Sequence, residues 1–226
     1  MAIGIGIDVY GTLIDPLGMS EHLRPLIADV SGAAAEKIAG SWRARQLEYT
    51  FRRAAMGAYE NFDVCTRDAL RFVFDSLKIA LSSAEEARLL EAYQSLAPYP
   101  DALAGLLELK RRGYKLAAFS NGVEATLRKL LGEAGLLDQF DTIISADALK
   151  TFKPDPRVYR YLVERLGTTL GETWLISSNA FDVIGAKAAG LHAAWIRRDP
   201  ATVFDPWGMQ PDLVAPSLAE LAQQFD

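Results

Sequence analysis

Short apolar runs alternate with longer helical patterns along most of the chain, and small or polar residues separate them. The runs that favour β-strands lie at residues 3–7, 115–119, 142–144, 173–176 and 192–196, with a further short one near residues 213–214. Glycines punctuate the helical stretches at positions 113, 135, 167 and 190, as left-handed helix caps commonly do. Strands that alternate with helices are typical of βαβ units, so the pattern predicts an α/β fold with a Rossmann-like, doubly wound parallel sheet.

The pattern changes directly after the first strand. Helical stretches rich in Ala, Leu, Arg and Glu follow, without a convincing strand. Two segments that contain proline, residues 15–18 and 97–100, interrupt both periodicities and are the expected hinges. We therefore predict a core domain made of residues 1–15 and 98–226, with an inserted helical cap domain made of residues 16–97.

Composition and charge narrow the class of protein. The chain has 226 residues, of which 50% are hydrophobic, and its formal charge is −5 from 24 basic and 29 acidic residues. No run of Lys and Arg is present that would follow a nucleic-acid backbone, so no nucleic-acid partner is expected. No stretch approaches the ~18 apolar residues of a membrane span, and no leader-like segment precedes Asp8. A cytoplasmic protein without membrane contact is expected.

Cysteine and histidine offer little chemistry in this chain. Cys65 has no second cysteine to pair with, and His22 and His192 lack the spacing of metal ligands. Neither thiol nor imidazole catalysis is therefore expected.

Polar side chains instead follow the ends of the predicted strands. They are Asp8 with Thr12, Ser120 with Asn121, Lys153, and Ser177, Ser178 and Asn179 with Asp182. Parallel strands point the same way, so these residues are expected to meet at the sheet edge where open α/β sheets bind ligands. Each also has an ordinary structural interpretation, since Ser-Asn-Gly is a common turn and Asn179 could cap a helix. Together they make a catalytic set, with Asp8 as the candidate nucleophile.

The segment from Asp8 to Thr12 resembles the first motif of the haloacid dehalogenase superfamily. Most members of that superfamily transfer phosphoryl groups, and a second Asp, which protonates the leaving oxygen, stands where this chain has Tyr10. A departing halide ion needs no proton, so Tyr10 favours carbon–halogen bonds over phosphate esters. The longer resemblance, to the L-2-haloacid dehalogenases, runs nearly end to end and rests on residues 8–12, 41–43, 46–50, 119–122, 153–155, 157–159 and 177–182.

This resemblance implies a two-step hydrolysis of L-2-haloacids, the short-chain 2-haloalkanoates, to D-2-hydroxyacids and halide. Asp8 would attack C2, displace halide with inversion and form an ester that water then cleaves. Lys153 would keep Asp8 ionised and, with Ser120 and backbone N–H groups after the first strand, would bind the substrate carboxylate.

The same resemblance assigns the remaining site residues. Arg43, Asn121 and Phe181 match the residues that cradle the halide. Asp182 matches the residue that orients or activates water, with support from Thr12, Ser177 and Asn179. The residues that match positions lining or bracing the pocket are Val9, Tyr10, Leu47, Phe62 and Tyr159.

The role of Arg43 can also be considered from its sequence neighbours alone, without the family resemblance. Its neighbours at three and four places along a helix are Ala39, Gly40, Gln46 and Leu47, none of them acidic, whereas Glu48 can pair with Arg45 or Arg52. A solvated arginine is the ordinary interpretation of such a residue. The family match favours a halide-binding arginine instead.

Metal use distinguishes the dehalogenases from the phosphatases. This chain has Ser177 and Ser178 where the Mg²⁺-dependent phosphatases carry an acidic metal ligand, and hard Mg²⁺ prefers charged oxygen ligands. We therefore predict activity without a metal or another cofactor. Two other functions stay open: a Mg²⁺-dependent small-molecule phosphatase, and a non-catalytic protein that retains a haloacid pocket. The resemblance further implies a homodimer.

Overall fold

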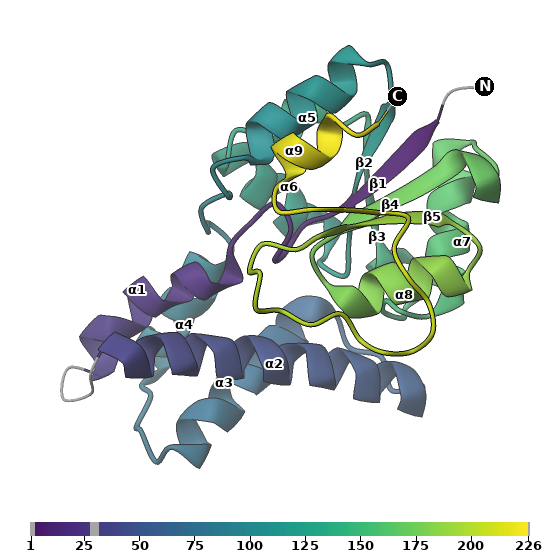
Figure 1. Ribbon diagram of the computed structural model, residues 1–226. Helices are drawn as coiled ribbons and strands as arrows, with labels where there is room; N and C mark the ends of the chain where they lie inside the picture. The colour runs from purple at the N-terminus through teal and green to yellow at the C-terminus, as the bar shows by residue number, and fades with distance from the viewer. Residues whose placement is uncertain (1–2, 28–31, 226) are drawn as a thin grey trace.

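Figure 1 shows a computed structural model of the protein, which describes residues 3–27 and 32–225. The outer limits of the predicted core domain, residues 1 and 226, and residues 28–31 of the predicted cap lie outside this range. Six strands in the described part of the chain form one parallel sheet, in the order β3-β2-β1-β4-β5-β6. Their bounds are Gly4–Asp8 (β1), Lys115–Ser120 (β2), Thr142–Ser145 (β3), Thr173–Ser177 (β4), His192–Ile196 (β5) and Leu213–Ala215 (β6). The predicted parallel α/β sheet is confirmed.

Helices cover both faces of this sheet (Figure 1). Successive side chains of β2 point to opposite faces: Leu116 and Ala118 pack in one core cluster, Ala117 and Phe119 in another. The first cluster includes side chains of α5 (Ala102–Arg111), α6 (Glu124–Glu133) and α9 (Leu218–Ala222). The second includes side chains of α7 (Pro156–Leu166) and α8 (Ala180–Ala188). The fold is therefore doubly wound.

Glycine in β1 allows α7 to pack directly on the centre of the sheet. A Cβ atom on Gly6 would lie 2.5 Å from a methyl group of Leu162, and one on Gly4 would lie 3.0 Å from Leu166. Larger residues would push α7 away from the strand. The alternating Ile and Gly of β1 thus place a large side chain on one face and a helix close to the other.

The segment between β1 and α5 is helical in the described residues. It contains α1 (Met19–Leu23), α2 (Gly32–Met56), α3 (Phe62–Ser76) and α4 (Ser83–Tyr93), which lie together below the sheet in Figure 1. Short 3₁₀ helices occur at Pro16–Gly18, Arg24–Ile27, Leu137–Gln139, Ala146–Leu149 and Leu170–Glu172. No strand lies in the described part of residues 16–97, as the sequence pattern predicts.

The two connections to this helical segment run side by side. The Asp15 N–H donates to the Ala97 carbonyl at 3.1 Å, and the Tyr99 N–H donates to the Leu13 carbonyl at 2.8 Å. Both predicted hinge segments therefore meet next to the turn that follows β1. This arrangement brings the helices of the inserted segment over the carboxyl edge of the sheet.

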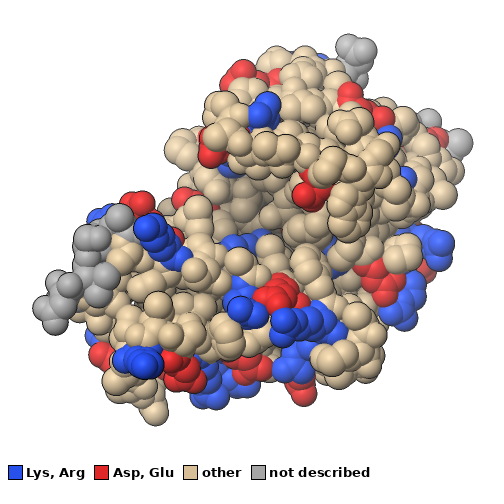
Figure 2. Space-filling view, turned by 60° about the horizontal axis from the view of Figure 1, so that its bottom comes forward, with Lys and Arg blue, Asp and Glu red and all other residues tan. Residues whose placement is uncertain are grey.

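The molecular surface carries both signs of charge. Figure 2 shows Lys and Arg interspersed with Asp and Glu on the face turned to the viewer, without one extended area of a single sign. None of the helices in the described residues is both long and apolar enough to cross a membrane.

Candidate active site

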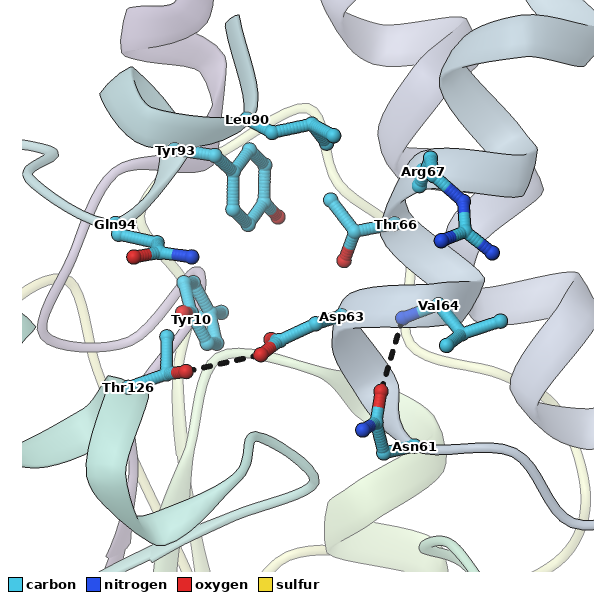
Figure 3. A pocket seen from close by; sticks show the side chains of 10 residues that line it. All are labelled: Tyr10, Asn61, Asp63, Val64, Thr66, Arg67, Leu90, Tyr93, Gln94 and Thr126. Atoms are coloured by element: carbon cyan, nitrogen blue, oxygen red, sulfur yellow. Dashed lines mark hydrogen bonds between the residues drawn. The ribbon is translucent and has the colours of Figure 1, made fainter. Parts of the chain in front are cut away.

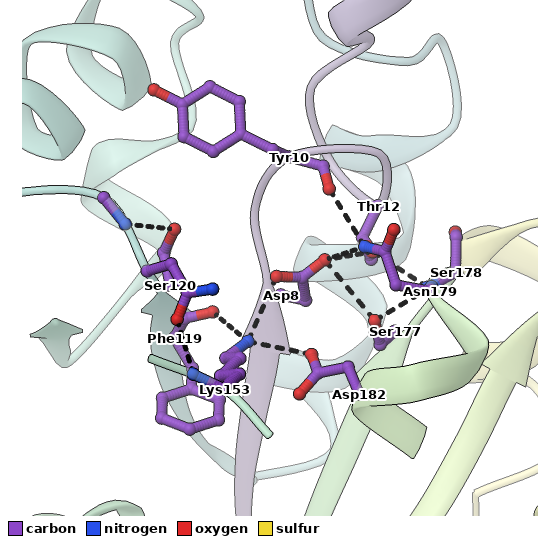
Figure 4. A network of polar contacts seen from close by, with 12 residues as sticks. Asp8, Tyr10, Thr12, Phe119, Ser120, Lys153, Ser177, Ser178, Asn179 and Asp182 are labelled. Carbon is purple, nitrogen blue, oxygen red and sulfur yellow. Dashed lines mark hydrogen bonds and ion pairs between the residues drawn. The ribbon is translucent and has the colours of Figure 1, made fainter. Parts of the chain in front are cut away.

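Asp8 is the last residue of β1 and lies between the neighbouring strands β2 and β4. Only 7% of its surface is exposed, and both carboxylate oxygens accept hydrogen bonds. Oδ1 accepts from Lys153 Nζ at 3.1 Å, and Oδ2 accepts from Thr12 Oγ1 at 2.8 Å and Asn179 Nδ2 at 2.7 Å (Figure 4). These contacts hold the carboxylate in one orientation, as an attacking group requires.

The turn after β1 brings Thr12 back to Asp8. Gly11 has a φ of +88°, in the left-handed region that glycine adopts without a steric cost, and its N–H donates to the Ile14 carbonyl at 2.7 Å. Thr12 is fully buried, and its hydroxyl also accepts from the Ser178 N–H at 2.8 Å. One threonine thus joins the ends of β1 and β4.

Lys153 lies between two carboxylates in the centre of the site. It is 2% exposed, and its Nζ donates to Asp8 at 3.1 Å, to Asp182 Oδ2 at 2.8 Å and to the Phe119 carbonyl at 2.9 Å. These contacts use all the N–H donors of an ammonium group. The Lys153 backbone N–H donates to Asn121 Oδ1 at 2.8 Å, which fixes the lysine against the end of β2.

Asp182 lies behind Lys153, in the first turn of α8, and has no exposed surface. Its Oδ1 accepts from the Tyr159 hydroxyl at 2.8 Å. Burial raises the pKa of the Asp182 carboxyl, and the Lys153 ammonium opposes that shift. Burial also raises the pKa of the Tyr159 hydroxyl well above its usual value, so Tyr159 remains a donor. An Asp182 carboxylate with a raised pKa is a stronger proton acceptor than an exposed aspartate.

The residues after β4 complete the surroundings of Asp8. Asn179 Nδ2 donates to the Tyr10 carbonyl at 3.1 Å as well as to Asp8. Ser177 Oγ accepts from the Asn179 N–H at 3.1 Å and lies 3.4 Å from Asp8 Oδ2. Ser178 Oγ is buried and has no hydrogen-bond partner among the described residues. The predicted polar groups at the ends of β1 and β4 therefore do meet.

Arg43 extends from α2 to the turn after β1. Its guanidinium donates to Gln46 Oε1 at 2.8 Å and to the Tyr10 carbonyl at 3.1 Å. As expected, no acidic side chain pairs with Arg43 among the described residues, whereas Glu48 pairs with Arg45 at 2.6 Å and also with Arg52.

Gln46 is a residue of this site that the sequence analysis did not select. It is fully buried, and its Oε1 accepts from the Tyr93 hydroxyl at 3.0 Å in addition to Arg43. A buried amide that holds an arginine could have been inferred from its place, three residues after Arg43 on the same helix.

A small cavity connects these groups. Its volume is about 10 Å³, room for about one water molecule. The residues that line it are Asp8, Tyr10, Arg43, Leu47, Phe62, Ser120, Asn121, Lys153, Asn179 and Phe181. Five of the predicted site residues do not line this cavity: Val9, Thr12, Tyr159, Ser177 and Asp182. Val9 packs in the core. Thr12 and Ser177 hydrogen-bond to Asp8, Asp182 hydrogen-bonds to Lys153, and Tyr159 hydrogen-bonds to Asp182.

Tyr10 also lines a second pocket (Figure 3). Its volume is about 230 Å³. Thr126 of α6 donates to Asp63 of α3 at 3.0 Å there, and burial raises the pKa of the Asp63 carboxyl. The Tyr10 ring packs on Tyr93 and Phe62, with centroids 5.4 and 5.5 Å apart. Tyr10 is thus a fixed wall of both spaces.

The acidic residues of the site do not suit a divalent metal ion. No group of three or more His, Cys, Asp or Glu side chains in the described residues could hold one. Asp8 and Asp182, which could supply oxygen ligands, both face the Lys153 ammonium instead.

Comparison with known proteins shows the family to which this chain belongs. The sequence model of the family described as haloacid dehalogenase-like hydrolase matches residues 4–190. An (S)-2-haloacid dehalogenase from Pseudomonas sp. strain YL is 38% identical over 226 residues, which cover 99% of this chain and 94% of that protein. An (S)-2-haloacid dehalogenase 4A from Burkholderia cepacia is 40% identical over 217 residues, 95% of this chain and 90% of that protein.

A solved structure of an L-2-haloacid dehalogenase has the same fold as this chain. The L-2-haloacid dehalogenase from Xanthobacter autotrophicus with chloropropionic acid covalently bound superposes with a TM-score of 0.88 and 34% sequence identity. The match covers 99% of this chain and 98% of that one. The chain therefore belongs to the haloacid dehalogenase-like hydrolases and, within them, to the (S)-2-haloacid dehalogenases.

Proposed function

We propose that this protein hydrolyses L-2-haloacids to D-2-hydroxyacids and halide through an ester on Asp8. The observation that carries the proposal is the Lys153 ammonium held between Asp8 and Asp182, beside a cavity that Arg43 also lines. This arrangement supplies an oriented carboxylate nucleophile, and its positive charge comes from the chain itself. A covalently bound chloropropionic acid in the relative from Xanthobacter autotrophicus supports a covalent step.

In the first step, a carboxylate oxygen of Asp8 forms a bond to C2 while the carbon–halogen bond breaks on the opposite side. The halogen leaves with the bonding electrons, so negative charge develops on it. Arg43, Asn121 and Phe181 line the cavity and are the proposed halide contacts. Donors that are already oriented toward a developing charge are the most effective stabilisers of a transition state.

The substrate carboxylate needs donors of its own. Lys153 has no N–H left for it, since Asp8, Asp182 and the Phe119 carbonyl accept all of them. We therefore assign the direct contacts to Ser120, which lines the cavity, and to backbone N–H groups after β1, while Lys153 acts through its charge.

In the second step, water adds to the Asp8 carboxyl carbon, and the bond between that carbon and the ester oxygen breaks, so that this oxygen stays on C2 as the hydroxyl group of the product. Asp182 is the proposed proton acceptor, because burial raises the pKa of its carboxyl and each carboxylate oxygen can accept another hydrogen bond. Asn179, Ser177 and Thr12 lie against Asp8 and would orient its carbonyl group for the attack.

The test is halide release from each enantiomer of 2-chloropropionate in the presence of EDTA, with Asp8→Asn as the control variant. We expect chloride from the L-enantiomer alone, and none from Asp8→Asn. Chloride release that is lost in EDTA and restored by Mg²⁺ would contradict the metal-independent mechanism. The phosphatase alternative would require phosphate release from an aryl phosphate with Mg²⁺, and Tyr10 opposes it because no acid stands there to protonate the leaving oxygen.

We further propose that residues 16–97 act as a cap domain on a core of residues 1–15 and 98–226. We also propose that the protein forms a homodimer and works in the cytoplasm. Sedimentation of the purified protein tests the dimer directly.

A further inference from the structure

A large apolar cleft lies next to the reaction cavity. Its volume is about 840 Å³, against about 10 Å³ for the cavity around Asp8. Side chains of four parts of the chain line it: Phe51 and Ala54 of α2, Phe152 and Pro154 of the segment before α7, Ile184 of α8, and Trp207 and Met209 of the connection between β5 and β6. In Figure 1 this connection passes over α8 and approaches α2.

The cleft and the cavity share a wall. Phe181 lines both of them, and the consecutive residues Lys153 and Pro154 line the cavity and the cleft respectively. The Phe181 ring meets the Phe51 ring edge to face, with centroids 5.1 Å apart and an angle of 73° between the planes. A phenyl ring forms no polar contact that would hold it, so this pair can separate at the cost of one aromatic contact.

The opposite wall of the cavity is much less free to move. Tyr10 is 3% exposed and packs against both Phe62 and Tyr93, whereas Phe181 is partly exposed. A substrate larger than the cavity will therefore displace Phe181 rather than Tyr10. The space that opens behind Phe181 is apolar.

We propose that this cleft is a subsite for the alkyl chain of longer 2-haloalkanoates, with Phe51 and Phe181 as the residues that determine chain-length specificity. The inference rests on the proposed function. The carboxylate, C2 and halogen of such a substrate need the polar groups around Asp8, so only the alkyl chain suits an apolar lining. The charged side chains of the cleft are those of Asp155 and Asp205, which disfavour a second carboxylate at the far end of the chain.

The experiment compares kcat/KM for L-2-bromooctanoate and L-2-bromopropionate in two tryptophan variants of α2. Ala54 lines the cleft, and Ala54→Trp places an indole ring in it. Ala55 is the next residue, is exposed and does not line the cleft, so Ala55→Trp is the matched control. Each buried methylene group contributes about a fourfold gain in binding. We expect Ala54→Trp to lower the ratio of the two kcat/KM values at least tenfold, and Ala55→Trp to leave it unchanged.

Wild-type protein that releases bromide from 2-bromopropionate but not from 2-bromooctanoate would overturn the proposal. An equal ratio in the two variants would overturn it as well.

Failure of the proposed function would be distinguishable, because bromide would then be released from neither substrate. In that case, binding of octanoate tests the cleft independently of catalysis. We expect octanoate to change the tryptophan fluorescence of the wild-type protein and propionate to leave it unchanged. Neither acid is expected to change the fluorescence of Trp207→Phe. No response to octanoate would count against the subsite.

Discussion

Among the single residues of the site, Lys153 has the central electrostatic role, because its ammonium group lies between the carboxylates of Asp8 and Asp182. A buried ammonium and two buried carboxylates are each costly to remove from water, and the contacts of 3.1 and 2.8 Å compensate that cost. Lys153 thus supplies a positive charge in contact with both carboxylates of the site.

Removal of the Lys153 charge tests this balance. We expect Lys153→Met to lower the rate of halide release by at least about a hundredfold and to cost about 3–5 kcal/mol of unfolding free energy, because two carboxylates lose their partner. Lys150→Met is the matched control, since Lys150 is exposed and pairs only with Asp147 among the described acidic residues. Urea denaturation and chloride assays measure both effects. Similar behaviour of the two variants would refute the assignment.

We expect the second step to depend on pH through Asp182. Burial raises the pKa of the Asp182 carboxyl. As the pH falls, activity that needs the carboxylate form is therefore lost at a higher pH than it would be with an exposed aspartate. The Tyr159 hydrogen bond lowers that pKa, and its removal raises it further. We expect Tyr159→Phe to move the acidic limb of the kcat profile to higher pH, and Tyr161→Phe, on the same helix, to leave it in place. An unmoved limb in Tyr159→Phe would mean that Asp182 is not the group that titrates.

Most of these residues were predictable from the sequence, and some were not. Asp8 ends β1, Thr12 and Lys153 lie in the connections after β1 and β3, and Asp182 lies in the first turn of α8, so the parallel topology brings them together. Gln46 was not selected: its place three residues after Arg43 indicates the contact with the guanidinium, but its contact with Tyr93, which is distant in the sequence, could not be predicted. Contacts of this kind depend on tertiary packing, which the local pattern does not specify.

At the scale of elements, the hydrophobic pattern predicts the strands closely. The first strand is observed at Gly4–Asp8 against the predicted residues 3–7, and the fifth at His192–Ile196 as predicted. Buried strands of a parallel sheet are short apolar runs bounded by turn residues, which makes them easy to find. The cleft beside α8 was not predictable, because the connection after β5 has no periodicity.

The packing of α7 against α8 depends on one glycine. A Cβ atom on Gly185 would lie 2.4 Å from the Tyr159 hydroxyl and 2.8 Å from Pro154 Cβ. We expect Gly185→Ala to lower the unfolding free energy by about 1–3 kcal/mol and to slow catalysis, because Tyr159 is pushed away from Asp182. Gly40→Ala in α2 is the control: no atom lies within 4 Å of its added Cβ, so a gain of up to about 1 kcal/mol is expected. Thermal unfolding that leaves Gly185→Ala unaffected would contradict this packing.

At the scale of the whole molecule, Arg198 joins distant parts of the chain around the site. It follows β5, pairs with Asp101 at the start of α5 at 2.8 Å, and stacks on the Tyr99 ring at 3.7 Å. It also donates to the Thr12 carbonyl. The return from the helical segment, the C-terminal part of the sheet and the turn beside Asp8 are thus held together.

We expect Arg198→Met to cost about 2 kcal/mol of unfolding free energy, because it removes charge-assisted hydrogen bonds from a mostly buried pair. Arg197→Met is the matched control, since the hydrogen bonds of the Arg197 side chain within the described residues go to carbonyls of its own loop, at Pro200 and Thr202. Its expected cost is within about 0.5 kcal/mol. Equal midpoints for the two variants in chemical denaturation would show that Arg198 has no such role.

The most direct test of the covalent mechanism is a single turnover of L-2-chloropropionate in ¹⁸O-labelled water, with the protein in excess over substrate. We expect the hydroxyl oxygen of the first lactate formed to be unlabelled, because it comes from Asp8, and we expect mass spectrometry to find ¹⁸O in the peptide that contains Asp8. Labelled lactate and an unlabelled peptide would contradict it, since water would then have attacked C2 directly.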